Sequence, residues 1–305
     1  MATKRASNEI KRAKTQKGRR FLIAREPKVV ENAKTTMFIR GGKTSEIVTQ
    51  ALKDLCALKK PNCVLFKRKN ILRPFQDETS IEFFSNKNDA SMFIFGSHSK
   101  KRPHNLVMGR CFDGHILDMI ELGIENFTPL SKFKTEKCAS GTKPCLLFVG
   151  EAFESDPEYM RLKNLLIDIF RGPDVEKVRL QGLEHVMQFT ELDGKIFFRS
   201  YRILLKKSGT RTPRVELEEM GPSMDLVKRR VKLASDDLWK RAVKKPKNLK
   251  PKKTKNISHD AFGTKLANIH MKRQDYSKLQ TRKMKGLKRQ ADKTDGRAKK
   301  RRTSV

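Results

Sequence analysis

The chain has 305 residues, with 69 Lys and Arg against 34 Asp and Glu, and a formal net charge of +35. The excess charge is concentrated at the two ends. Residues 240–305 carry 24 basic against 4 acidic residues, residues 1–30 carry 10 against 2, and residues 31–239 are nearly balanced at 35 against 28. A balanced body between two basic arms is typical of a folded module that binds a polyanion, which leaves RNA, DNA or an anionic membrane.

The composition argues against membrane insertion and against a secreted, disulfide-rich protein. No apolar run approaches the roughly 18–20 residues that span a bilayer, and the N-terminus lacks the apolar segment of a signal peptide. The sequence has five cysteines, an odd number, and no C-x-x-C motif. We therefore expect neither a disulfide framework nor a zinc site. We therefore expect a soluble intracellular protein, with a membrane surface as the weaker partner because no basic amphipathic helix with bulky apolar residues is evident.

The charge distribution predicts three regions. Residues 1–30 form a basic N-terminal arm, residues 31–239 form the folded body, and residues 240–305 form a basic tail. The tail contains few large apolar side chains, so we expect it to stay largely disordered until it binds a partner, apart from a short helix near Ser235–Lys244.

The first part of the body begins with the motif GGKTS at residues 41–45, followed by apolar residues at helical spacing up to Leu58. Thr44 or Ser45 can cap this helix, and Pro61 stops it. The segment from His115 predicts a further helix that breaks near Gly123. Between these two helices we expect a strand at 63–66, a helix at 80–89, a strand at 91–97, a turn at 100–105 and a strand at 105–112.

The second part repeats the order of strand, helix and antiparallel strands. An apolar strand at 145–150 precedes a helix at 158–170, which Gly172-Pro173 ends. A hairpin over 178–206 turns at Asp193-Gly194, and two short strands flank Gly221-Pro222. We therefore predict an α/β (α+β) fold built from two similar halves, about 31–140 and 141–239.

The sequence offers no convincing catalytic or nucleotide-binding motif. The GGKTS motif lacks the first glycine of a phosphate-binding loop, because Met37 stands at that position, so a plain helix N-terminus is the better interpretation. On a helix, Asp118 could share a face with His115 or with Glu121 and form a general acid–base pair. Solvated helix charges are far more common, so we expect no catalytic residue, no cofactor and no metal.

Four basic clusters interrupt the body, at 67–70, 99–104, 206–214 and 228–232, and we expect them at turns and strand ends. Together with the arms they favour nucleic acid, since guanidinium groups on loops bind phosphate oxygens well. One Trp and three Tyr give no pattern for stacking single strands, so recognition of structured RNA by shape and phosphate fits better. The candidate RNA-binding residues are Lys67, Arg68, Lys100, Lys101, Arg102, Lys206, Lys207, Arg211, Arg214, Arg229, Arg230, Lys232, Lys244, Lys245, Lys252 and Lys253.

Several strings resemble the Brix-domain family. They are ILRPF at 71–75, FGSHSKKRPHNLVMGR at 95–110, DIFRGP at 168–173, and VELEEMGPSMDLVKRR at 215–230. The resemblance implies a two-part α/β fold whose halves are similar to the anticodon-binding domain of class IIa aminoacyl-tRNA synthetases. It also implies a non-enzymatic factor of the nucleus and nucleolus that assembles the large (60S) ribosomal subunit and supports pre-rRNA maturation.

The resemblance further implies named partners. Such a factor would pair with the regulator of ribosome synthesis protein, and would bring 5S rRNA and the 5S-associated ribosomal proteins into the pre-60S particle. The lysine-rich blocks at 244–255 and 298–302 resemble nuclear localisation signals and could equally bind RNA.

Two other function classes stay open. An RNA-modifying or RNA-cleaving enzyme would need titratable groups that converge in one pocket, whereas an assembly factor needs an extended basic face. A DNA-binding chromatin protein is the weaker alternative, because the sequence contains no helix-turn-helix, zinc-finger or basic-zipper pattern.

Overall fold

The computed structural model describes residues 14–25, 31–175, 177–179, 182–245 and 255–275. The chain forms two compact units, residues 1–250 and 251–305. In the described part of the smaller unit, strands β11 (Ile257–His259) and β12 (Lys265–Ala267) pair as an antiparallel hairpin.

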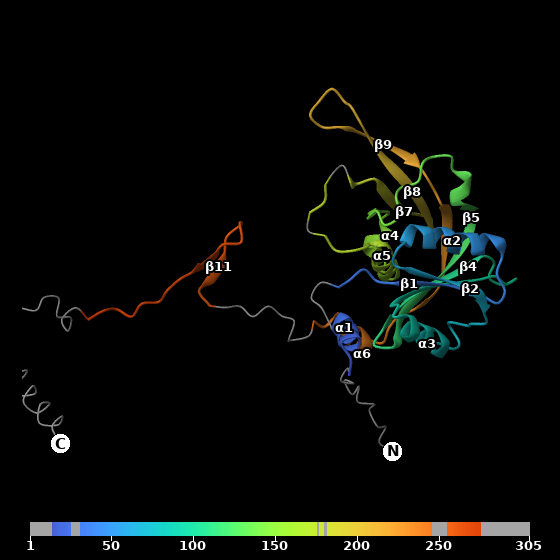
Figure 1. The fold of residues 1–305 in the computed structure, drawn as a ribbon. Helices are drawn as coiled ribbons and strands as arrows, with labels where there is room; N and C mark the ends of the chain where they lie inside the picture. The colour runs from blue at the N-terminus through green and yellow to red at the C-terminus, as the bar shows by residue number, and fades with distance from the viewer. Residues whose placement is uncertain (1–13, 26–30, 176, 180–181, 246–254, 276–305) are drawn as a thin grey trace, which may run out of the picture. The chain divides into compact units, whose positions relative to one another are not determined.

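The larger unit is built on one ten-stranded mixed sheet (Figure 1). Its strands run in the order β2-β1-β3-β4-β5-β10-β8-β7-β6, with β9 paired to β8. The strands are β1 Thr36–Gly41, β2 Cys63–Asn70, β3 Met92–Ser97, β4 Asn105–Phe112, β5 His115–Thr128, β6 Cys145–Val149, β7 His185–Leu192, β8 Lys195–Lys206, β9 Arg214–Glu219 and β10 Ser223–Lys232. The helices are α1 Gln16–Arg25, α2 Glu46–Lys59, α3 Thr79–Asn88, α4 Ala152–Ser155, α5 Pro157–Phe170 and α6 Asp236–Val243, with a 3₁₀ turn at Leu130–Lys132.

Parallel pairing is confined to the two ends of the sheet. Strand β1 lies parallel to β2 on one side and to β3 on the other, and β6 lies parallel to β7. All other pairs are antiparallel, including β5 with β10, which joins the β1–β5 part of the sheet to the rest. The α/β fold class predicted from the sequence is confirmed, whereas the division into arm, halves and tail stays a prediction.

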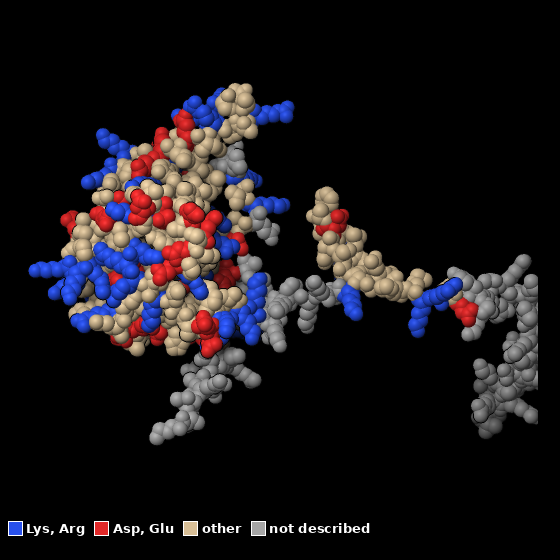
Figure 2. All heavy atoms as spheres, turned by 180° about the vertical axis from the view of Figure 1, so that it is seen from behind, with Lys and Arg blue, Asp and Glu red and all other residues tan. Residues whose placement is uncertain are grey.

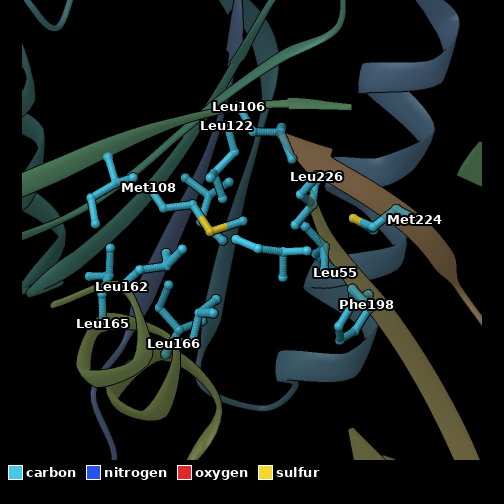
Figure 3. Close-up of a cluster of buried hydrophobic side chains, with 14 of the residues drawn as sticks. Leu55, Leu106, Met108, Leu122, Leu162, Leu165, Leu166, Phe198, Met224 and Leu226 are labelled. Atoms are coloured by element: carbon cyan, nitrogen blue, oxygen red, sulfur yellow. The ribbon is translucent and has the colours of Figure 1, made fainter. Parts of the chain in front are cut away.

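One face of the sheet is buried along most of its width, and the opposite face is buried over the β1–β5 part. On one face, α2 and α5 cover the strands, and Figure 3 shows side chains from α5, β4, β5, β8 and β10 meeting in one cluster. On the other face, α3 covers a smaller cluster that contains Met37, Phe93, Phe95 and Val107. Complete burial of one such side chain contributes about 1.5–3 kcal/mol.

The predicted helix at His115 is wrong, because this segment forms the 14-residue strand β5. Its residues 116–124 are buried without interruption, since this central strand is covered on both faces. A strand buried on both faces shows a continuous apolar run instead of alternation, and such a run cannot be told from a helix by periodicity alone.

Most other elements are confirmed with small shifts in their ends. Ser45 caps α2 by accepting a hydrogen bond from the Val48 amide at 3.3 Å. The Asp193-Gly194 turn has positive φ at both residues (52° and 74°), as a tight hairpin requires. Helix α6 begins after Ser235, as predicted. Strand β1 and helix α1 were missed, since TMFIRG is short and QKGRRFLIAR, with four basic residues among its ten, lies in the segment that was assigned to the basic arm.

We expect acid to destabilise the fold through His185 on β7. This side chain is buried and its Nε2 lies 2.9 Å from the Ser200 hydroxyl. Burial lowers the pKa of His185 to about 4, so the unfolded chain takes up a proton that the folded chain does not. Stability is therefore lost as the pH falls from about 6.5 towards 4, by about 2 kcal/mol between pH 7 and pH 5.

The measurement is chemical unfolding at pH 7 and pH 5 for the wild type and for His185→Gln. The variant should lose most of this pH dependence, although its stability at pH 7 can be lower. An equal pH dependence in both proteins would contradict the assignment to His185.

Candidate nucleic-acid interface

The carboxyl ends of three parallel strands define the region of interest. Because β2, β1 and β3 run in the same direction, they all end at one edge of the sheet. The chain leaves β1 through α2 to reach β2, and then passes through α3 to reach β3, with α2 and α3 on opposite faces. In α/β sheets, ligands bind outside the carboxyl ends of the strands at such a switch point.

Three of the four predicted basic clusters converge at this edge. Lys67 and Arg68 are exposed near the end of β2, and Lys100, Lys101 and Arg102 are exposed in the loop that follows β3. Figure 2 shows Lys and Arg side chains gathered at the level of β2. We call this surface the basic edge, defined by the exposed cations Lys67, Arg68, Lys69, Lys100, Lys101 and Arg102.

The third cluster, 228–232, reaches the basic edge from strand β10. Lys228 pairs with Leu122 and Val231 pairs with Ile120, so Arg229 and Arg230 form a bulge between them. The clusters at 67–70 and 228–232 form the carboxyl-terminal halves of β2 and β10, so both lie at strand ends and neither lies in a turn.

The cations of the third cluster have partners within the molecule. Arg229 donates to Asn105 Oδ1 and to the Pro103 carbonyl, both at 2.9 Å. Arg230 donates to both carboxylate oxygens of Glu121, at 2.5 and 3.1 Å, and Lys232 pairs with Glu78. These contacts hold the β3–β4 loop in place, while direct RNA binding by the three residues stays a prediction.

A second set of contacts ties the GGKTS loop to the β3–β4 loop. The Ser45 hydroxyl lies 2.8 Å from His104 Nδ1, and the His98 amide donates to the Lys43 carbonyl at 2.9 Å. Partial burial, followed by the electrostatic effects of His98 and Arg229, lowers the pKa of His104. The motif is therefore a capped helix N-terminus, as predicted, and it supports the basic edge.

Gly123→Ala should displace Arg229 without changing any charge. A Cβ at Gly123 would lie 2.3–2.5 Å from the Arg229 guanidinium. We expect this substitution to break the two Arg229 hydrogen bonds and to cost about 1–3 kcal/mol of unfolding free energy. In an Arg229→Ala background the same glycine substitution should cost much less. Equal costs in the two backgrounds, measured by urea unfolding, would refute the coupling.

The side chains of His115, Asp118 and Glu121, which a helix would have brought onto one face, do not meet on strand β5. Asp118 lies on the α5 face and is bound by Arg110 through two contacts of 2.7 Å. Glu121 lies on the opposite face with Arg230 and Asn105, while the His115 side chain is largely exposed and lies 3.4 Å from Glu82. They are separated because an odd residue spacing on a strand directs side chains to opposite faces, whereas a spacing of three on a helix places them on one face. Within the described ranges, no group of three or more His, Cys, Asp or Glu could hold a metal ion.

The remaining predicted residues lie elsewhere. Lys206 and Arg214 pair with Glu216 at the base of the β8–β9 hairpin, and Lys207 and Arg211 are exposed in its loop. This hairpin projects from the part of the sheet far from β2 (Figure 1). Lys244 and Lys245 are exposed after α6, and Lys252 and Lys253 fall outside the described residues.

Sequence reasoning missed three residues at the same edge. Lys69 lies within a cluster that was recognised, and Arg73 and Phe75 lie within the ILRPF string. The signal was present, but nothing in a linear string indicates that residues 72–76 lie beside residues of the 95–107 segment and residue 230 around one pocket.

Comparisons with known proteins show the family of this chain. A family model described as Brix domain matches residues 41–230. The chain is 62% identical to a protein named Ribosome production factor 2 homolog from Homo sapiens, over 84% of each chain. It is also 62% identical to the protein of the same name from Mus musculus over 85% of each chain, and 50% identical to that from Drosophila melanogaster over 92% of this chain and 88% of the other.

The chain therefore belongs to the Brix domain family, and within it to the group of ribosome production factor 2 homologues.

Proposed function

We propose that this chain is a non-enzymatic biogenesis factor of the large ribosomal subunit that binds 5S rRNA and helps to bring it into pre-60S particles. Membership of the ribosome production factor 2 group supports a role in ribosome biogenesis. The observation that carries the RNA contact is the basic edge, where cations distant in sequence converge at the carboxyl ends of β2 and β3. Such a surface binds phosphates without reading sequence.

The proposal includes a protein partner, the regulator of ribosome synthesis protein, along with the 5S-associated ribosomal proteins. In the described part of the chain, β6 pairs only with β7, and Leu147 and Val149 on β6 are 41% and 49% exposed. An open strand with apolar side chains is a site where another chain can add a strand.

Localisation in the nucleus and nucleolus belongs to the same proposal. The described residues contain no helix that could span a membrane.

The non-enzymatic part rests on the geometry of β5. Asp118 and Glu121 were the acid–base candidates in the sequence, and they lie on opposite faces of the sheet, each bound by an arginine. These two described carboxylates therefore lend no support to the RNA-modifying or RNA-cleaving alternative.

The test is binding of purified full-length chain to 5S rRNA across a salt titration. The logarithm of the affinity should fall linearly with the logarithm of salt concentration, with a slope set by the number of phosphates neutralised. Deleting residues 240–305 removes 24 basic residues and should flatten that slope. An unchanged slope would mean that residues 240–305 make no phosphate contact and that the body alone carries the binding, whereas absence of binding at physiological salt would overturn the proposal.

A further inference from the structure

A pocket of about 300 Å³ opens beside the basic edge, on the face of the sheet that α3 covers. It lies at the carboxyl ends of β2 and β3, where the chain turns towards α3 and β4. Phe75, Phe95 and Val107 give it an apolar lining, and Arg73, Arg102 and Arg230 contribute three cations. These six residues come from four separate stretches of the chain.

One part of the pocket is held rigidly. The guanidinium carbon of Arg230 lies 4.0 Å from the centre of the Phe75 ring. Glu121 fixes the Arg230 nitrogens, and its own side chain is only 1% exposed and also accepts from Asn105 Nδ2 at 2.7 Å. A planar aromatic ring and a planar guanidinium held in this way form a stacking surface, because nucleobases stack on both groups.

The charges of the lining favour an anionic ligand. The lining contains three arginines and one carboxylate, that of Glu121, and Arg230 already neutralises this carboxylate. Arg73 is exposed and donates to Gln76, while Arg102 lies 3.8 Å from Glu121 on the solvent side. Both can turn towards a phosphate. The volume is at the small end of ligand pockets, which suits one nucleotide.

We propose that this pocket receives a single unpaired nucleotide of RNA, with its base against Phe75 and Arg230 and its phosphate beside Arg73 and Arg102. The proposal rests on RNA binding by the basic edge and assigns to that surface a second mode of contact. The aromatic residues follow no pattern in the sequence, so base stacking was not expected. Folding nevertheless brings Phe75, from the segment after β2, and Phe95, from β3, to one pocket.

The experiment uses two RNA hairpins that differ by one base. One carries a single bulged nucleotide, and the other carries an abasic residue at the same place, so the number of phosphates is equal. The full chain should bind the bulged RNA about ten-fold or more tightly than the abasic RNA, with each of the four bases tried in turn. Phe75→Leu should remove this difference. Phe83→Leu, at an aromatic residue of α3 that is 60% exposed, is the matched control and should retain it.

A measurement on the unaltered protein covers the case in which Phe75→Leu folds poorly. A photoreactive 4-thiouridine at the bulge should crosslink the wild type at residues 72–76. Equal affinity for both hairpins, or crosslinks only elsewhere, would overturn the proposal while leaving RNA binding intact. Failure to bind either hairpin would overturn RNA binding itself. If base discrimination is absent and Phe75→Leu instead loses a protein partner on co-purification, the pocket belongs to a protein segment and the proposal fails.

Discussion

Replacing Arg110 by Met should destabilise the body by about 3–5 kcal/mol, because it leaves a buried carboxylate without its cation. Arg110 on β4 is 8% exposed and binds Asp118, which is 2% exposed, through two hydrogen bonds of 2.7 Å. It also donates to Asn164 at 2.7 Å and to Asp168 at 2.6 Å on α5. One guanidinium therefore joins the sheet to its covering helix, and urea unfolding would measure its loss.

The same network predicts a rescue. Asp118→Leu added to Arg110→Met removes the stranded charge, so the double variant should regain at least half of the lost stability. Asp168 still has a cation in both variants, because its carboxylate also pairs with the Lys34 ammonium at 3.1 Å. The control is Arg171→Met, which removes an exposed pair with Asp174 and should cost less than about 1 kcal/mol. A double variant as unstable as the single one would show that packing of the Arg110 side chain, and not its charge, is what matters.

Neutralising the basic edge should weaken RNA binding more than neutralising any other surface of the body. We expect the variant with Lys67, Arg68, Lys100 and Lys101 all changed to Gln to bind 5S rRNA about ten-fold or more weakly at physiological salt. The magnitude of the slope of log affinity against log salt should decrease by about 3, since each of the four phosphate contacts contributes roughly 0.7–0.9. The four residues are exposed, so the unfolding midpoint should stay unchanged.

The matched control changes the same number of charges on the β8–β9 hairpin, at Lys206, Lys207, Arg211 and Arg214. Two of these cations already share Glu216, and the hairpin lies far from β2, so the effect on affinity should be smaller. Equal losses in the two variants would mean that net charge alone, without the arrangement at the basic edge, sets the affinity.

The sequence by itself determined the elements whose signals are local. The cap at Ser45, the amphipathic pattern of α5 and the turn at Asp193-Gly194 each depend on residues within one or two turns of chain, so they could be predicted one by one. Net charge and its uneven distribution also follow from composition, and they were enough to point to a polyanion.

Tertiary structure decided what depends on residues far apart in the chain. Strand β5 was misassigned because its burial on both faces comes from α3 and α5, which are remote from it in sequence. The basic clusters at 67–70, 99–104 and 228–232 lie close together only because of the strand order. Strands β2 and β3 run parallel on either side of β1, and β10 pairs with β5. The pocket likewise needs Phe75 and Arg230, 155 positions apart, in stacking contact. Local patterns cannot encode such contacts, since strand order and direction fix them only after the sheet has assembled.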